Sequence, residues 1–140
     1  MTAYEIIDFI CDSVNPILFF VAIFLALAEL TKRNFKAFSV ALIFLFASLG
    51  LVYGILFIDN KIKIWESFGS DYSTHTAFAI AVCVSISVIK KWNKWLLFVI
   101  LLYSLAMLYQ RYHTILDIFS TSVIVAIPLV ISRKFLKKLL

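Results

Sequence analysis

Residues 37–58 read AFSVALIFLFASLGLVYGILFI, a run of 22 residues without a charged side chain. About 20 consecutive apolar residues let a helix cross the roughly 30 Å hydrocarbon core of a bilayer. Four more apolar runs flank this one. The sequence therefore predicts an all-α, polytopic membrane helical bundle with about five transmembrane helices, at 15–30, 37–58, 72–89, 95–110 and 112–132.

The composition of the chain agrees with a lipid environment. Of its 140 residues, 64% are hydrophobic and 15% are charged, whereas soluble domains are about 45–50% apolar and about 25% charged. Three glycines and two prolines leave little material for a loop-rich β fold. We expect one membrane domain over 1–140, with an amphipathic N-terminal segment at 1–14, the bundle at 15–132 and a basic tail at 133–140.

The cations predict the orientation of the bundle. Ten of the 13 Lys and Arg follow the first, third or fifth apolar run: Lys32, Arg33, Lys36, Lys90, Lys91, Lys94, Arg133, Lys134, Lys137 and Lys138. The positive-inside rule makes these connections and the C-terminus cytoplasmic. The N-terminus and the 59–71 and 110–113 connections are then outside a plasma or bacterial inner membrane. Such clusters do not form the basic stripe of a nucleic-acid-binding surface.

Gly50-x-x-x-Gly54 places two glycines on one face of the second helix. Small residues let helices approach closely in lipid. Two interpretations are open, a homodimer through Gly50 and Gly54 or packing within the bundle, and we expect the second.

Both histidines stand at run ends predicted to face outward, in SDYSTHT at 70–76 and QRYHTILD at 110–117. The unpaired N–H groups and positive dipole of a helix N-terminus favour anions. We expect each histidine in the first turn of its helix. Two such helix starts at one membrane face, with Arg111 beside one of them, predict a phosphate pocket.

The spacing also suggests chemical roles. His113 and Asp117 are four residues apart, so on a helix the carboxylate orients one ring nitrogen and leaves the other as a nucleophile. His75 has no such acid nearby and suits protonation of a leaving oxygen. Ser73 is expected either to cap its helix or to donate to a phosphate oxygen.

The stretch YSTHTAFA at 72–79 resembles the PSGHTAFA motif of the type 2 phosphatidic acid phosphatase superfamily, the integral-membrane lipid phosphatases. His113-x3-Asp117 is similar to the end of that family's S-R-x5-H-x3-D motif, and the resemblance covers residues 50–132. It implies a phosphatase without metal or cofactor. In it His113 forms a phosphohistidine, Asp117 orients His113, and His75 protonates the leaving alkoxide.

The chain departs from the family in its phosphate-binding cations. The Ser-Arg pair of the third motif falls on Ala106 and Met107, and no Arg-Pro of the first motif is present. Arg111, one turn later, is expected to reach the same oxygens if the helix continues. The expected substrate-binding residues are Arg111, Ser73, Thr74, Lys61 and Lys63.

These features lead to three functional hypotheses. The first is hydrolysis of a lipid phosphate: a polyprenyl diphosphate, phosphatidate or phosphatidylglycerol phosphate. A phosphotransferase with another acceptor, and a non-catalytic lipid-phosphate-binding protein of the same fold, stay open. The expected partners are this substrate and membrane lipids. The 59–71 loop is expected at the membrane interface, as a lid or an aromatic anchor, through Ile62, Ile64, Trp65 and Phe68.

Overall fold

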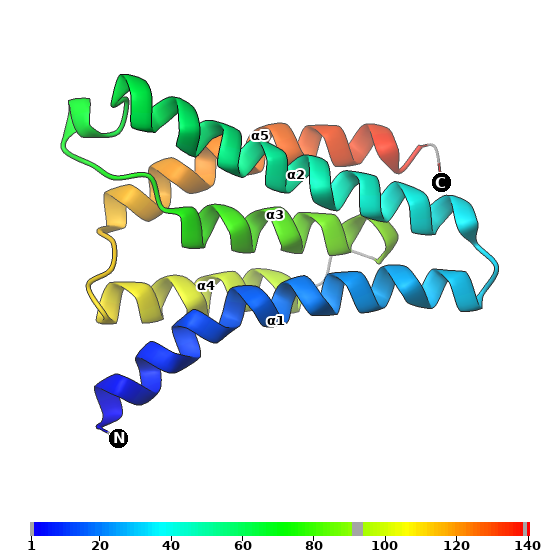
Figure 1. The fold of residues 1–140 in the computed structure, drawn as a ribbon, viewed down its shortest axis with the longest axis horizontal. Helices are drawn as coiled ribbons and strands as arrows, with labels where there is room; N and C mark the ends of the chain where they lie inside the picture. Colours follow the sequence, from blue (N-terminus) through cyan, green and yellow to red (C-terminus); the bar gives the residue numbers. More distant parts are fainter. Residues whose placement is uncertain (1, 91–93, 139) are drawn as a thin grey trace.

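The computed structural model describes residues 2–90, 94–138 and 140, and in these ranges the chain is helical without a strand. The elements are α1 (Ala3–Thr31), α2 (Phe35–Ile62), the 3-10 helix η1 (Glu66–Phe68), α3 (Thr74–Ile89), α4 (Lys94–Tyr109) and α5 (Ile115–Leu136). The five α-helices lie side by side along one direction (Figure 1). The predicted all-α bundle is confirmed.

Three helices of the described chain are long and apolar enough to cross a membrane, at Tyr4–Thr31, Phe35–Ile62 and Ile115–Leu136. The other two, α3 and α4, have 16 residues each. At 1.5 Å per residue they are about 24 Å long, shorter than the roughly 30 Å hydrocarbon core. The three long helices fit a membrane protein, and the count of five spans stays a prediction.

The central element is α3, which contacts each of the other four helices. Figure 1 shows it running through the middle of the bundle. Nearly all of its residues from Thr76 to Val88 are buried, and Ala77, Ala81 and Ser85 are small. Small side chains let neighbouring helices come close, which is how membrane helices gain packing energy without a hydrophobic drive. The Ser85 hydroxyl donates to the Ala81 carbonyl, so its burial leaves no donor unpaired.

The N-terminal segment belongs to the first helix. A capping box starts α1, in which Thr2 Oγ1 accepts from the Glu5 N–H and the Glu5 carboxylate accepts from the Thr2 N–H. The helix continues through Pro16, and its first turns lean away from the bundle in Figure 1. Proline removes a backbone donor and bends helices. The described part of 1–14 is therefore continuous with the first apolar run.

The glycines of α2 do not pack inside the bundle. A Cβ atom at Gly50 or Gly54 would meet nothing within 4 Å, because α2 turns a different face inward, with Ala41, Phe44, Leu45, Ser48 and Val52 buried. The expectation that the glycines serve intramolecular packing is wrong. A homodimer across this open face stays a prediction.

The two ends of the bundle carry different side chains. The α1–α2 connection lies at one end of the bundle, and the end of α3, the start of α4 and the end of α5 lie toward that same end (Figure 1). The described members of the three cation clusters lie there, while Lys91 lies outside the described residues. Glu29 is buried at this end and pairs with Lys32 at 2.7 Å. Because α5 runs to Leu136, the basic tail begins as helix.

Candidate active site

The histidines occupy different positions at the start of their helices. His75 is the second residue of α3, whereas His113 directly precedes Thr114, the N-cap of α5. The expectation that His113 lies in the first helical turn is therefore wrong. The capping box of Thr114 and Asp117 starts the helix two residues beyond His113.

The two imidazole rings nevertheless lie together. Their centroids are 6.3 Å apart and their planes are tilted by 57°. Tyr112 stacks on His75 with a centroid distance of 6.0 Å and an angle of 21°. The prediction that the two histidines meet at one end of the bundle is confirmed, and their chemical roles stay predictions.

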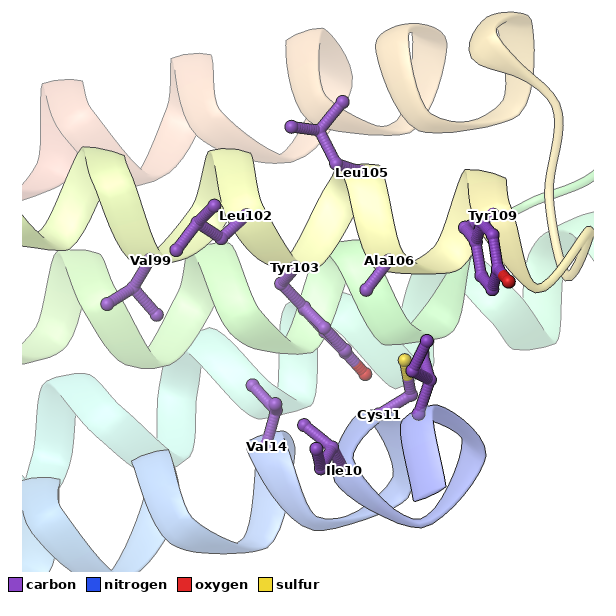
Figure 2. Close-up of a pocket in the computed structure, with 10 residues that line it drawn as sticks. Ile10, Cys11, Val14, Val99, Leu102, Tyr103, Leu105, Ala106 and Tyr109 are labelled. Carbon is purple, nitrogen blue, oxygen red and sulfur yellow. The ribbon is translucent and has the colours of Figure 1, made fainter. Parts of the chain in front are cut away.

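A tyrosine that sequence reasoning missed orients His75. The Tyr103 hydroxyl lies 3.0 Å from His75 Nδ1. Tyr103 is buried in α4, and Figure 2 shows its side chain extending from α4 toward α1. A hydrogen bond at Nδ1 sets the ring orientation and leaves Nε2 as the other ring nitrogen for chemistry. Nothing in the apolar run 95–110 marks Tyr103, because its partner comes from another helix.

Asp117 lies beside His113 but is mainly engaged elsewhere. Its Oδ1 accepts from Ser70 Oγ at 2.6 Å and from the Asp71 N–H at 2.7 Å, and its Oδ2 accepts from the Thr114 N–H at 2.6 Å. The distance from His113 Nδ1 to Asp117 Oδ2 is 3.8 Å, too long for a hydrogen bond. The carboxylate thus caps α5, ties the 70–71 segment to it, and lies within ion-pair distance of the ring.

Burial sets the charge state of His113. Removal from water lowers the pKa of His113 below its ordinary value, Asp117 opposes this, and His75 lowers the pKa further. The ring is therefore neutral at neutral pH. A neutral imidazole has a free electron pair, which a nucleophile requires.

Unpaired polar atoms gather around the histidines. Four buried side-chain atoms of the described residues make no hydrogen bond, on Asn15, Ser48, Gln110 and His113. Asn15 donates to the His75 carbonyl at 3.3 Å, and Gln110 belongs to the connection that carries His113, so three of the four are at this site. Buried polar groups are normally paired, and exceptions often accompany a catalytic role.

The N-terminal half of α1 braces the connection that carries His113. Gln110 Nε2 donates to the Tyr4 carbonyl at 2.9 Å, and the Tyr112 hydroxyl donates to Asp8 Oδ1. These contacts join residues more than 100 positions apart in the chain. The first helix therefore helps to position the site, a role that sequence reasoning did not assign to it.

Arg111, the arginine expected to bind phosphate, does not lie on a helix. Helix α4 ends at Tyr109, so the condition under which Arg111 was expected to reach the same oxygens, a continued helix, is not met. Arg111 is exposed and adopts a left-handed conformation with φ 58°. The Arg111 and Tyr112 N–H groups bond back to Leu108 and Met107, the arrangement that usually selects glycine at this position. Arg111 thus adds positive charge two residues before His113.

The two lysines are not brought to the histidines by any contact in the described part of the chain. Lys63 Nζ lies 3.6 Å from Glu66 Oε2, with both side chains exposed. Lys61 Nζ lies 5.8 Å from the centre of the Phe57 ring. Their expected contact with substrate therefore stays a prediction without support from the geometry.

Ser73 and Thr74 form the start of α3. Ser73 Oγ accepts from the Thr76 N–H and donates to Thr76 Oγ1 at 2.8 Å, and the residue is fully buried. The capping interpretation of Ser73 is confirmed, and its hydroxyl is not available to a phosphate. Thr74 lies partly exposed in the first turn beside His75.

The 59–71 loop does not place its tryptophan at a membrane interface. Trp65 is 2% exposed. Its backbone N–H donates to Asp59 Oδ1 at 3.0 Å and its indole N–H donates to Ser120 Oγ at 2.9 Å. Tyr72 packs edge-on against it at 4.9 Å. Trp65 therefore joins α2 to α5 inside the protein, and the expectation that it lies at the interface is wrong. Ile62, Ile64 and Phe68 are exposed, so a lid or anchor formed by these residues stays a prediction.

Two apolar cavities adjoin the site. The larger, about 560 Å³, lies between the first half of α1 and α4 and has Cys11, Tyr103 and Ala106 in its wall (Figure 2). The smaller, about 360 Å³, lies between α1, α2 and α3 and has Thr74 and His75 in its wall. Only the smaller cavity is lined by one of the two histidines.

The described residues contain no group of three or more His, Cys, Asp or Glu that could hold a metal ion. Comparison of the chain with protein-family models, curated proteins and solved structures finds no match. The motif resemblance and the geometry of the site are therefore the grounds for a functional proposal.

Proposed function

We propose that this protein is a membrane phosphatase that hydrolyses a phosphate ester or diphosphate of a lipid through a phosphohistidine on His113. The observation that carries the proposal is the 6.3 Å separation of the His75 and His113 rings at one end of an apolar helical bundle. This separation between ring centroids is of the same order as two reactive contacts of roughly 3–3.5 Å each placed end to end. One ring can then attack phosphorus while the other serves the leaving group.

In the first step, His113 Nε2 attacks phosphorus and the bond from that phosphorus to the leaving oxygen breaks. The leaving oxygen belongs to the lipid alcohol in an ester and to the lipid phosphate in a diphosphate. Neutral His113 supplies the electron pair, and Asp117, 3.8 Å from Nδ1, stabilises the positive charge that develops on the ring. Protonated His75 gives its Nε2 proton to the leaving alkoxide, with its ring held by Tyr103.

In the second step, water attacks the phosphohistidine. His75, neutral after the first step, accepts a proton from this water, the P–N bond breaks, and inorganic phosphate leaves. Both histidines return to their starting states. The first-turn N–H groups that the caps leave unpaired, and the positive dipoles at the starts of α3 and α5, stabilise the phosphoryl oxygens in both steps.

A lipid substrate follows from the surroundings of the histidines. The site lies at the end of apolar helices, and the cavity that reaches His75 has aromatic walls. The cation clusters at the opposite end favour a cytoplasmic location for that end. We therefore place the histidine site at the outer face of the membrane.

The test is phosphate release by the purified protein in detergent, with a chelator present. Polyprenyl diphosphate, phosphatidate and phosphatidylglycerol phosphate are supplied in parallel, and wild type is compared with His113→Ala. We expect turnover of at least one lipid by wild type and loss of about 10⁴-fold or more in the variant. Full turnover by His113→Ala would refute the assignment of His113 as the nucleophile.

Trapping gives a second readout. During wild-type turnover of a radiolabelled lipid phosphate, alkaline quenching preserves an acid-labile phosphohistidine, and mass spectrometry locates it. We expect the label on the peptide that contains His113. Label on His75 instead would exchange the two proposed roles.

A non-catalytic lipid-phosphate-binding protein is the second candidate. It is favoured by the engagement of Asp117 with three other donors and by the long distance to His113. If this second candidate is correct, the protein binds a lipid phosphate saturably and releases no phosphate from any lipid of the panel. Chelator-resistant release that His75→Ala abolishes would eliminate it.

A further inference from the structure

The cavity between α1, α2 and α3 connects His75 with the side of the bundle. Four of its eight lining residues are aromatic: Phe19 and Phe20 of α1, Tyr53 of α2 and Phe78 of α3. The other four are Asn15, Pro16, Thr74 and His75. Phe20 and Tyr53 are exposed on the outer surface of the helices. This cavity, the His75 groove, is therefore open to whatever surrounds the apolar helices.

We propose that the His75 groove binds one hydrocarbon chain of the lipid phosphate, with the phosphate at the two histidines. The inference rests on the proposed function for the position of the phosphate. It adds where the chain lies and which side of the bundle the substrate enters from, between α1 and α2.

The direction of the groove supports this assignment. Both α1 and α3 start at the histidine end, so the groove passes inward along 15–20 of α1 and 74–78 of α3. These stretches correspond to about 6–8 Å along the helices. A lipid with its phosphate at the membrane surface extends its chain in this same direction, toward the middle of the bilayer.

The chemistry of the wall selects hydrocarbon. The wall has polar groups at Asn15, Thr74 and His75, and Asn15 bonds to the His75 carbonyl. Along Phe19, Phe20 and Phe78 water would lack the two or more polar partners that it needs. The aromatic rings give a chain extensive dispersion contacts. The helices that form the groove include two of the three that are long and apolar enough to cross a membrane, so acyl or isoprenoid chains are the surrounding solvent.

The larger cavity between α1 and α4 is the competing location. Neither His75 nor His113 is among the residues that line it (Figure 2). Tyr103, which lines it, has its hydroxyl 3.0 Å from His75 Nδ1. A chain in that cavity would have Tyr103 between it and the ring. The His75 groove has no such side chain between its wall and the histidine.

A matched pair of variants tests the groove. Phe20 lines it and is 68% exposed, whereas Phe24, one helical turn further along α1, is 71% exposed and does not line it. We expect Phe20→Ala to raise KM for a long-chain lipid phosphate roughly three- to tenfold, with Phe24→Ala unchanged. Both variants should hydrolyse a short-chain, water-soluble ester of the same head group like wild type. Equal effects of the two variants on the long-chain substrate would overturn the proposal.

Photolabelling tests the same inference without turnover. A lipid phosphate with a photoreactive group in its chain is illuminated with wild type and with His113→Ala. We expect label on Phe19, Phe20 or Phe78 in both proteins, and label confined to 99–109 of α4 would overturn the proposal. If wild type releases no phosphate but the groove is labelled, the phosphatase function fails and the chain-binding site stands.

Discussion

The two histidines have the same side chain in two different surroundings. His75 lies within a helix, its Nδ1 is 3.0 Å from the Tyr103 hydroxyl, and Tyr112 stacks on its ring. His113 lies in a connection before a helix, and its Nδ1 makes no hydrogen bond to the described residues. The His75 ring is therefore held on several sides, whereas no hydrogen bond holds the His113 ring at Nδ1, the nitrogen that lies 3.8 Å from Asp117 Oδ2.

This difference matches the division of labour in the proposed reaction. A proton donor must be aligned with the leaving oxygen, and a ring fixed by a hydrogen bond and a stacked neighbour is aligned before substrate arrives. A nucleophile must be neutral before attack and stabilised as a cation afterwards. Burial keeps His113 neutral, and Asp117 lies close enough to stabilise the cation.

The largest expected effect that separates the two roles comes from His75→Ala. Loss of a general acid lowers kcat by about 10²–10⁴-fold for a lipid alcohol, which is a poor leaving group. An aryl phosphate leaves without protonation, so the first step with it should remain close to the wild-type rate. The measurement is the burst of aryl alcohol in rapid mixing. If the burst rate with the aryl phosphate fell by the same factor as kcat with the lipid, the role of His75 as the acid would be contradicted.

Asp117→Asn addresses the environment of His113. The amide cannot accept from Ser70, Asp71 and Thr114 as the carboxylate does, and hydrogen bonds to charged groups contribute about 1.5–3 kcal/mol each. We expect a lower unfolding temperature and a kcat reduced by roughly 10–100-fold through loss of the charge beside the ring.

Thr114→Ala is the control for Asp117→Asn, because it removes the capping hydroxyl and leaves the carboxylate beside His113. We expect Thr114→Ala to lower the unfolding temperature but to retain more activity than Asp117→Asn. If the two variants lose the same activity at a temperature where both are folded, Asp117 acts only as a cap.

Apolar run lengths predicted most of the fold because membrane-type helices are marked by uninterrupted hydrophobic residues. The run 95–110 differs from α4 by one residue at each end. The last helix was predicted to start at residue 112 but starts at Ile115. The same carboxylate, Asp117, belongs to two patterns, His113-x3-Asp117 and Thr114-x-x-Asp117, and the prediction used the first. Here the shorter pattern, a capping box, decides the backbone.

The site was predictable only where chain direction decides the outcome. Helices that begin at the same end place His75 and His113 at that end whatever their rotation. Tyr103 and Trp65 depend on how individual helices rotate and pack, and a single apolar run contains no signal for that. The missed residues are therefore those whose partners lie on another helix: Ser120 for Trp65 and His75 for Tyr103.

The pH dependence of kcat/KM should report His113. The pKa of this residue is lowered, so its neutral form persists below the ordinary value of about 6.5, and activity is lost as pH falls through the lowered pKa. The loss below the midpoint should be about tenfold per pH unit. The folded state should lose stability at somewhat higher pH, as pH falls from about 6.5 to the lowered pKa, because in that window the unfolded chain binds the proton more tightly than the folded chain.

Asp117→Asn sharpens the pH prediction. The carboxylate raises the pKa of His113 against the effect of burial, so its removal should move the acid limb to still lower pH. The residual activity of the variant is sufficient for this profile if it is normalised to its own maximum. A limb that moves to higher pH would mean that another group controls it.

The smallest expected effect belongs to Tyr103→Phe, which removes the hydroxyl that lies 3.0 Å from His75 Nδ1. A neutral hydrogen bond contributes about 0.5–1.5 kcal/mol, so kcat should fall about 2- to 13-fold with KM unchanged. Tyr109→Phe is the matched control, because Tyr109 lies on the same helix and lines the same cavity but is 62% exposed. Combining Tyr103→Phe with His75→Ala tests whether Tyr103 acts through His75. If Tyr103 acts through His75, Tyr103→Phe has no further effect there, whereas an undiminished additional loss would mean that Tyr103 contributes to packing between α3 and α4 instead.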